Sequence, residues 1–150
     1  MKTVNLYTDG ACSGNPGVGA IGLILEYNGT EKEISEAYPD TTNNRMELLS
    51  AITGLEMLKE TCNVNLFSDS KYLCDAITKG WLRSWTVNGW KKADRKPVLN
   101  VELWERMSLM LEKHNVTVNW VKGHNGHPQN ERCDRLAVKA IEEYKGQNNV

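Results

Sequence analysis

The sequence of 150 residues predicts a mixed α/β fold, in which an antiparallel meander is extended by strands connected through helices. Three observations predict it. A strand-forming run over residues 3–8 is followed by the hairpin signal Asn28-Gly29, and a helical apolar stripe over residues 46–58 precedes another strand-forming run over residues 63–68. A strand reached through a helix is expected to lie parallel to the first strand of its sheet.

The first strand, residues 3–8, is expected to end at Asp9. Its Val, Leu, Tyr and Thr favour a strand, whereas the Gly, Ser, Asn and Pro of residues 10–17 stop one. Taken alone, an Asp before a Gly is most simply the start of a turn. Three later carboxylates at similar junctions favour instead a functional group at the exposed end of a central strand.

Residues 18–27 and 31–38 are expected to complete the meander, the second of them as an edge strand whose charges discourage further pairing. The start of this region also matches the dinucleotide-binding fingerprint, as Gly17-x-Gly19-x-x-Gly22. That fingerprint needs a helix after its turn, whereas a strand follows here, so we reject it. The glycines are expected to let another backbone, such as a nucleic-acid strand, approach closely.

The first helix is expected to begin with Thr42 or Asn43 as its N-cap. Apolar residues at helical spacing should form its buried stripe: Met46, Leu49, Ile52, Leu55 and Leu58. Glu47 lies beside this stripe. Taken alone, a glutamate near a helix start most often interacts with the helix dipole.

After the fourth strand, residues 63–68, Asp69 and Ser70 are placed to cap a helix that stops at Gly80. Capping by itself would explain Asp69. If the fourth strand lies parallel to the first, however, Asp9 and Asp69 project from the same edge of the sheet, on neighbouring strands about 4.8 Å apart. Two such carboxylates can bridge a metal ion.

The last third of the chain is expected to complete the sheet. Asn100 should cap a helix after Pro97, and residues 116–121 should form a fifth strand. A flexible loop then leads to a final helix over about residues 129–144, which bears Asp134.

Composition indicates an ordinary globular protein, with 40% hydrophobic and 25% charged residues. Residues 1–150 contain no internal repeat or linker, so a single domain is expected, with a tail that frays from about residue 146. No apolar run approaches the ~20 residues of a membrane helix and no signal peptide is recognisable, so a cytoplasmic location is the default expectation. The four cysteines form no C-x-x-C pair and are expected to be free thiols.

The net charge of −1 argues against general binding of polyanions, but the charge is unevenly distributed. Residues 79–96 hold six lysines and arginines against Asp94 alone, interleaved with Trp81, Trp85 and Trp90. Cations displace counterions from a nucleic-acid backbone and flat rings pack on sugars or bases, so this segment is a candidate nucleic-acid contact. The alternative is a solvated charged face with tryptophans in the core.

Four carboxylates stand at strand ends or on helices that follow them: Asp9, Glu47, Asp69 and Asp134. Two unit charges ~4 Å apart repel by ~4 kcal/mol at an effective dielectric constant of about 20, so such a cluster needs counterions. Oxygen ligands select hard divalent cations such as Mg²⁺ or Mn²⁺ over zinc, and two such ions can stabilise the attacking and leaving oxygens of a phosphoryl displacement. The sequence therefore favours nuclease chemistry.

The motifs also occur in a recognisable order. They are Thr8-Asp9-Gly10 with Gly14-Asn15-Pro16-Gly17, Thr42 to Glu47, Ser68-Asp69-Ser70, Trp120 to His124, and Asn130 to Asp134. This ordered set resembles bacterial type 1 ribonuclease H over essentially the whole chain. The resemblance implies a ribonuclease H-like fold, a five-stranded mixed sheet of order 3-2-1-4-5 flanked by helices. It also implies a monomeric, Mg²⁺-dependent endonuclease that hydrolyses the RNA strand of RNA–DNA hybrids and leaves 5′-phosphate and 3′-hydroxyl ends.

The same resemblance implies roles for the catalytic residues. Asp9 would bridge two metal ions, Asp134 would complete the site of the ion that activates the nucleophile, and Glu47 with Asp69 would hold the other ion. His124, on its loop, would assist proton transfer or product departure, a role suited to a group whose unperturbed pKa is about 6.5. A histidine in a glycine-containing loop is otherwise usually only solvated.

Substrate contacts are implied in the same way. Four residues would lie along the minor groove, where 2′-hydroxyls mark the RNA strand: Cys12, Asn15, Asn43 and Asn44. Thr42 and Asn100 would lie near a DNA phosphate, and Trp81 and Trp85 would face the DNA strand from the basic segment, the handle of the family.

The sequence departs from the family at three places. Thr86-Val87-Asn88 stands where close relatives have a basic run, Asp40 stands where some have an arginine, and Lys71 replaces a neutral residue beside the metal site. These departures bear on substrate affinity and not on the reaction.

Two alternatives of other classes remain open. One is a hybrid-binding module that has lost catalysis, against which the presence of all four carboxylates and of His124 counts. The other is a zinc-binding protein that uses His124, His127 and Cys133, which stoichiometric zinc in protein purified without chelator would favour.

Overall fold

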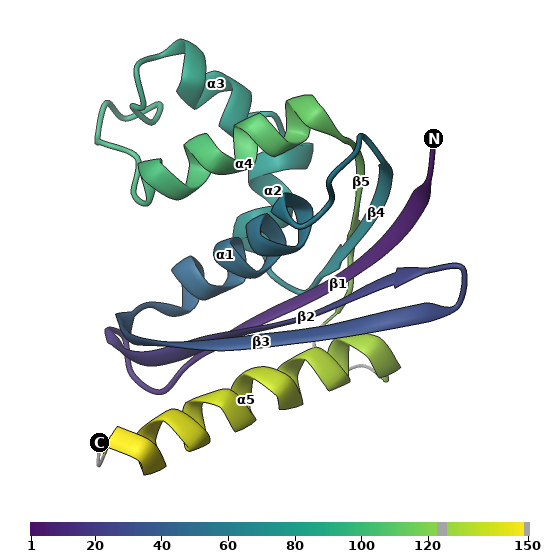
Figure 1. The fold of residues 1–150 in the computed structure, drawn as a ribbon. Coiled ribbons are helices and arrows are strands. Elements are labelled where there is room, and N and C mark those ends of the chain that lie inside the picture. Colours follow the sequence, from purple (N-terminus) through teal and green to yellow (C-terminus); the bar gives the residue numbers. More distant parts are fainter. Residues whose placement is uncertain (123–125, 149–150) are drawn as a thin grey trace.

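A computed structural model of the chain describes residues 1–122 and 126–148. Its five-stranded sheet has the order β3-β2-β1-β4-β5, as expected (Figure 1). The strands are β1 (Thr3–Cys12), β2 (Gly17–Tyr27), β3 (Thr30–Thr41), β4 (Asn63–Ser68) and β5 (Asn115–Trp120). The central strand β1 pairs antiparallel with β2 and parallel with β4, and β5 pairs parallel with β4, so the sheet is mixed.

Helices cover both faces of the sheet. They are α1 (Asn43–Glu56), α2 (Lys71–Thr78), α3 (Trp81–Val87), α4 (Val101–Lys113) and α5 (Pro128–Asn148). Helix α5 runs along one face across β1, β2 and β3, whereas α1 packs on the opposite face with α2, α3 and α4 beyond it (Figure 1). Within the described ranges, no helix is both long and apolar enough to cross a membrane.

The two faces of β1 serve two separate cores. Leu6 is fully buried against α1, where Ile52 and the rest of the expected stripe form the larger core. Tyr7 points the other way and packs with Cys133 of α5. Because alternate residues of a strand point to opposite faces, Asp9 lies on the same face as Tyr7, toward α5.

Two glycines allow the helices to approach the sheet. A Cβ atom on Gly22 would collide with the carbonyl oxygen of Cys133 in α5, and a Cβ atom on Gly10 would collide with the backbone of Met46 and Glu47 in α1. Gly22 was expected to admit another backbone, and the backbone it admits in this structure belongs to the chain itself.

The first strand does not end at Asp9, which corrects the expectation from its glycine-rich sequence. Strand β1 continues to Cys12 because it keeps β2 as a partner, in a register that pairs Asp9 with Gly22 and Cys12 with Gly19. The hairpin at Asn28 and Gly29 is confirmed: both residues have positive φ, 51° and 81°, as a two-residue turn of this type requires.

The observed helix ends agree only in part with those expected from the sequence. Thr42 is the N-cap of α1, and its hydroxyl accepts a hydrogen bond from the Arg45 N–H at 3.2 Å. Asn100 precedes α4 but makes no side-chain cap, because its amide group bonds to Arg45 and Tyr72 instead. The last helix, expected to stop near residue 144 before a frayed tail, remains helical as far as Asn148.

Candidate active site

The position of Asp9 follows from a difference in the lengths of two strand pairings. The parallel pairing of β1 with β4 ends at Tyr7 and Phe67, whereas the pairing with β2 continues five residues further, to Cys12. Asp9 therefore lies beyond the end of β4, at a place where the sheet is open on one side. Asp9 thus faces an opening at the end of the β4 pairing, although it is not the last residue of β1.

Glu47 reaches this opening from the helix on the opposite face. It is the fifth residue of α1 and only 5% of its surface is exposed. The Gly10 N–H donates a hydrogen bond to Glu47 Oε1 and another, of 3.0 Å, to Asp9 Oδ1. Glu47 lies beyond the first turn of α1, so the helix-dipole interpretation does not account for it.

Asp69 is the residue immediately after β4. The cap of α2 is Ser70, whose hydroxyl accepts from the Leu73 N–H at 3.1 Å, so the Asp69 carboxylate is not used as a cap. Its backbone carbonyl accepts a hydrogen bond of 3.2 Å from Nε1 of Trp120, the last residue of β5. Asp69 is thus held in place by its main chain while its side chain faces the cleft.

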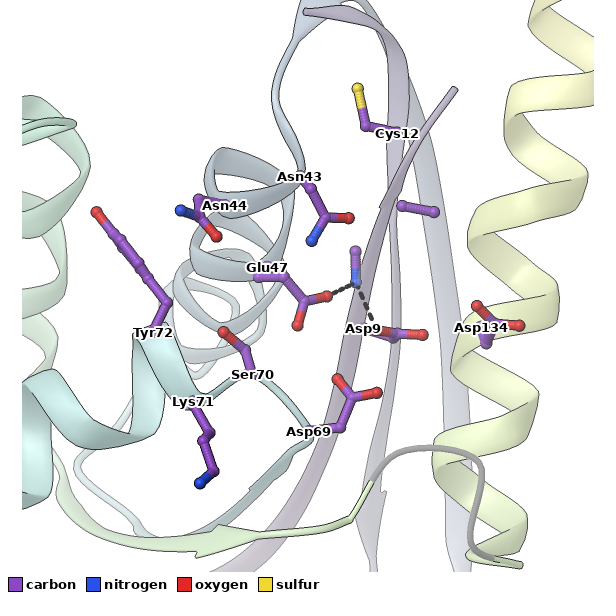
Figure 2. Close-up of a pocket in the computed structure, with 12 residues that line it drawn as sticks. Asp9, Cys12, Asn43, Asn44, Glu47, Asp69, Ser70, Lys71, Tyr72 and Asp134 are labelled. Atoms are coloured by element: carbon purple, nitrogen blue, oxygen red, sulfur yellow. Dashed lines mark hydrogen bonds between the residues drawn. The ribbon is translucent and has the colours of Figure 1, made fainter. Parts of the chain in front are cut away.

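Asp134 comes from α5, on the far side of β1 from Glu47. The helix is tied to the strand by Asn130, a buried residue one turn earlier, whose Nδ2 donates to the Thr8 carbonyl oxygen at 3.4 Å. This contact brings Asp134 across from Asp9 (Figure 2). Four elements, β1, α1, α5 and the segment after β4, therefore each supply one carboxylate.

The four carboxylates line one open cleft of about 480 Å³. Carboxylate oxygens of Asp9, Glu47 and Asp69 all lie within 4.8 Å of one another, and Asp134 completes the wall on the α5 side (Figure 2). The floor and remaining walls are mostly polar, with Cys12, Asn43, Asn44, Ser70, Lys71 and Tyr72 among the lining residues.

Crowding of these acids alters their protonation. Burial, followed by the charges of Asp69 and Asp134, raises the pKa of Asp9 to about 7, against the opposing effect of its hydrogen bonds. Burial and the neighbouring Asp9 likewise raise the pKa of Glu47 well above its usual value. Raised pKa values on two neighbouring acids are the effect of burial and of like charges close by, with no positive charge among the main causes.

The donor set fits a hard divalent cation. All the converging ligand atoms are carboxylate oxygens, which suit Mg²⁺, Mn²⁺ or Ca²⁺ better than zinc. Among the described residues, this is the one group of histidines, cysteines and acids close enough together to hold an ion.

The zinc alternative finds no support in the residues that can be placed. Cys133 is completely buried beside Tyr7 and Ile24. The His127 ring lies 5.7 Å from the rings of Tyr7 and Phe67, and its Nδ1 accepts a hydrogen bond from the Asn130 N–H. His124 lies outside the described residues, so its predicted role stays a prediction. All four cysteines are free thiols, as expected.

The residues predicted to contact the minor groove gather at one end of the cleft. Cys12, Asn43 and Asn44 line it directly. Asn15 joins them through its Oδ1, which accepts a hydrogen bond of 3.3 Å from the Asn43 N–H. Thr42 is adjacent in the chain.

Asn100 lies at the margin of the cleft. Its Oδ1 accepts from Arg45 at 3.1 Å and its Nδ2 donates to the Tyr72 hydroxyl at 3.1 Å. Because Arg45 can only donate, these bonds fix which end of the amide faces which neighbour and leave one N–H of Nδ2 for a further acceptor.

The two tryptophans predicted to face the DNA strand lie on α3. This helix is farther from the sheet than α1 (Figure 1). Trp81 is 43% exposed, and Lys79 Nζ lies 5.5 Å from its ring centroid. Trp85 is half-buried and packs edge-on against Trp104. The basic segment therefore combines an exposed aromatic ring, Trp81, with a ring anchored in the core, Trp85, and their contact with the DNA strand stays a prediction.

Sequence reasoning did not single out several residues that build the cleft. Gly10 supplies the N–H shared by two carboxylates, Asn130 positions α5, and Tyr72 lines the wall. Gly10 and Asn130 lie within motifs noted in the sequence. Their roles in positioning Glu47 and α5, however, depend on contacts between segments that are distant in the sequence, and a local sequence pattern does not show such contacts.

A mixed sheet with an open cleft beyond the end of its central strands, lined by carboxylates that could hold a cation, is typical of one class: the metal-dependent enzymes that act on phosphate esters. The chain belongs, within that class, to the RNase H family, whose model matches residues 1–142. A protein called Ribonuclease H from Desulforamulus reducens is 57% identical over 143 residues, which are 95% of this chain and 90% of that protein.

Comparison with solved structures leads to the same fold and family. The crystal structure of LC9-RNase H1, described as a type 1 RNase H with the type 2 active-site motif, is 32% identical with a TM-score of 0.84, over 95% of this chain and 74% of that one. The fold is also that of LC11-RNase H1, which was crystallised in complex with an RNA/DNA hybrid. That chain is 23% identical with a TM-score of 0.66, over 94% of this chain and 98% of that one.

Proposed function

We propose that this protein is a ribonuclease H that hydrolyses the RNA strand of RNA–DNA hybrids with two Mg²⁺ ions and leaves 5′-phosphate and 3′-hydroxyl ends. The single observation that supports the chemistry most directly is the convergence of Asp9, Glu47 and Asp69 within 4.8 Å in an open cleft. Membership of the RNase H family supports the choice of substrate.

The carboxylates are proposed to hold the metal ions. Asp9, placed between the others, would contribute to both ion sites, Glu47 and Asp69 to one and Asp134 to the other. Bound divalent cations would supply charge neutralisation for the phosphodiester and acidify the attacking water. The Gly10 N–H keeps Asp9 and Glu47 oriented, so their oxygens need little rearrangement when an ion arrives.

The remaining residues are proposed to bind and discriminate the two strands. Asn43 and Asn44, with Cys12 and Asn15, would contact 2′-hydroxyls of the RNA strand, the group that separates RNA from DNA. Their place in the cleft beside the carboxylates supports this.

The DNA strand is proposed to follow a path away from the carboxylates. Thr42 and the spare N–H of Asn100 would bind a DNA phosphate, and Trp81 with Trp85 would meet the DNA strand further along. His124 is proposed to assist proton transfer to the leaving oxygen or product departure.

The decisive experiment is cleavage of an end-labelled RNA–DNA hybrid. Cleavage confined to the RNA strand, dependent on added Mg²⁺ and giving 3′-hydroxyl termini, is the expected result. Binding without cleavage at any Mg²⁺ or Mn²⁺ concentration would instead favour the catalytically silent module. A matched duplex DNA and a matched duplex RNA serve as controls and should remain intact.

Three further properties accompany the proposal. A monomer is expected by light scattering, a cytoplasmic location by cell fractionation, and a single cooperative unfolding transition for a one-domain chain. Activity with Mn²⁺ in place of Mg²⁺ is to be measured in the same cleavage assay.

A further inference from the structure

Lys71 lines the cleft together with the four carboxylates, yet it is not paired with them. It is an exposed residue at the first position of α2, directly after the Ser70 cap. Its side chain extends away from Asp9 and Glu47 (Figure 2). Among the described residues it makes no salt bridge with any acid, although the cleft holds four.

The ammonium group is held by Trp120 instead. Lys71 Nζ lies 5.1 Å from the centroid of the Trp120 ring, within the range of a cation–π contact. The indole is fixed in turn, because its Nε1 donates to the Asp69 carbonyl oxygen and the next residue, Val121, donates its N–H to the Ser68 carbonyl oxygen at 2.9 Å. The position of this positive charge is therefore set by the main chain that also positions Asp69.

Stability of the helix does not explain the lysine. The first turn of a helix is the positive end of its dipole, where a cation is unfavourable, and α2 has no acid in that turn to compensate. Neutralising the buried acids does not explain it either, since Lys71 is not among the main groups that shift the pKa of Asp9 or Glu47. What remains is a charge presented to the solvent side of the cleft.

We propose that Lys71, seated on Trp120, binds a backbone phosphate of the RNA strand next to the phosphate held at the carboxylates. This deepens the proposed function and rests on it. The strand is assigned by position: Lys71 is two residues from Asp69, so the phosphate within its reach belongs to the strand that the carboxylates hold. A lysine binds phosphate as a flexible point charge, and stacking on an indole restricts it to one side of the cleft.

The first test is the salt dependence of hybrid affinity, measured between 50 and 200 mM salt in Ca²⁺, which is expected to support binding without turnover. One phosphate contact adds ~0.9 to the slope of log affinity against log salt, which is about 3.5-fold over this interval. Lys71→Gln should lower the slope by that amount, whereas Lys71→Arg, which keeps the charge and can stack on Trp120, should retain it.

Lys2→Gln is the matched control. Lys2 Nζ also lies over an aromatic ring, 5.3 Å from the Tyr27 centroid, but at the start of β1, seven residues before Asp9 and thus roughly 23 Å along the strand. The change removes the same charge from a lysine that lies over an aromatic ring, although Lys2 also pairs with Glu60 at 2.7 Å. Its slope should equal that of the parent.

The second test locates the phosphate by a double-mutant cycle. Each phosphate of the RNA strand near the cut site is replaced singly by an uncharged methylphosphonate, and affinity is measured for the parent and for Lys71→Gln. One linkage next to the cut site should weaken the parent severalfold and leave the variant unaffected.

Two outcomes would overturn this inference without affecting the proposed function. In the first, the parent binds and cleaves the hybrid, but Lys71→Gln has the same salt slope as the parent. In the second, the double-mutant cycle couples Lys71 only to linkages of the DNA strand. A parent that neither binds nor cleaves hybrid would instead remove the proposed function and this inference with it.

Discussion

Asp9 and Glu47 accept hydrogen bonds from one and the same donor, the backbone N–H of Gly10. Asp9 belongs to the strand β1 and its side chain lies on the face of the sheet covered by α5, whereas Glu47 comes from α1 on the other face. The amide group of Gly10 brings the two carboxylates together. This arrangement is possible because Gly10 has no Cβ, so the backbone of α1 can lie directly against β1. The active-site geometry therefore depends on a close backbone contact between β1 and α1.

Gly10→Ala should consequently damage both stability and activity. A Cβ atom there would overlap the backbone at Met46 and Glu47, which no side-chain movement can relieve. Overpacking of this kind costs about 1–3 kcal/mol of unfolding free energy, and displacement of Glu47 should reduce cleavage strongly. Urea unfolding and hybrid cleavage are the measurements. Gly146→Ala, in α5 with no atom within 4 Å of the added Cβ, should lower neither stability nor activity, and equal losses in the two variants would contradict the argument.

The raised pKa values of Asp9 and Glu47 predict a pH dependence of stability in the absence of metal. In the native state Asp9 keeps its proton up to about pH 7 and the pKa of Glu47 is also raised, whereas unfolded carboxyl groups lose their protons near pH 4. The native state thus binds more protons in this window, so the free energy of unfolding should fall as pH rises through it.

The control for this pH effect is the double variant Asp9→Asn with Glu47→Gln, which lacks both titrations. With chelator present, it should become more stable relative to the parent as pH rises, by on the order of 1–4 kcal/mol at pH 8. Added Mg²⁺ should stabilise the parent at pH 8 more than the double variant, because the variant keeps only Asp69 and Asp134 of the four carboxylates. A parent that gains stability relative to the variant between about pH 4 and 7 would contradict the prediction.

Asp69→Asn should abolish cleavage and leave hybrid binding largely intact. The change removes one metal-ligand charge, and folding should be preserved because Ser70, not Asp69, caps α2. Asp75→Asn makes the same substitution later in α2, at a residue that pairs with Lys79 outside the cleft, and should retain full activity. Substantial turnover of the Asp69 variant in saturating Mg²⁺ would remove Asp69 from the metal site.

His124→Ala should slow turnover by much less than a carboxylate change. General acid–base assistance contributes about 10²–10⁴-fold, and a residue on a loop is expected at or below the lower end of that range. Single-turnover and multiple-turnover rates, measured beside those of Asp69→Asn, separate an effect on chemistry from one on product release. Equal rates for parent and variant in both regimes would exclude His124 from the mechanism.

The less basic handle predicts a shallow salt dependence of hybrid binding. Residues 86–88 are exposed at the end of α3, so Thr86→Lys, Val87→Lys and Asn88→Arg can be accommodated. If this surface meets backbone phosphates, the three added contacts should tighten binding at moderate salt and steepen its salt slope, so that affinity falls by up to about 40-fold more than that of the parent between 50 and 200 mM salt.

The control for the handle adds the same charge at the end of α5, as Gly146→Lys, Gln147→Lys and Asn148→Arg. These residues are exposed and about 18 Å along the helix from Asp134, at a rise of about 1.5 Å per residue. Equal salt slopes for the two triple variants would mean that residues 86–88 do not contact the substrate and that their effect is one of net charge alone.

Much of this protein is determined locally and could be predicted from its sequence. Asn28-Gly29 makes a hairpin because both positions need positive φ, and Thr42 caps α1 because a short hydroxyl side chain reaches the free N–H of Arg45. The periodicity of apolar residues gave the strands and helices, and the order of these elements gave the parallel relation of β1 to β4. Each depends on residues within a few positions of one another or on the order of whole elements.

The tertiary structure alone decided how the carboxylates are used. Asp9 lies inside β1 and yet at an opening, because β2 and β4 accompany that strand for different lengths. Glu47 shares a donor 37 positions away, and Asp134 depends on a bond between Asn130 and Thr8, 122 positions apart. Asn100 became a link to Arg45 and Tyr72 rather than a cap for the same reason. A sequence pattern shows which residues can form such bonds, but the free energy of packing the whole sheet against its helices selects which of them form.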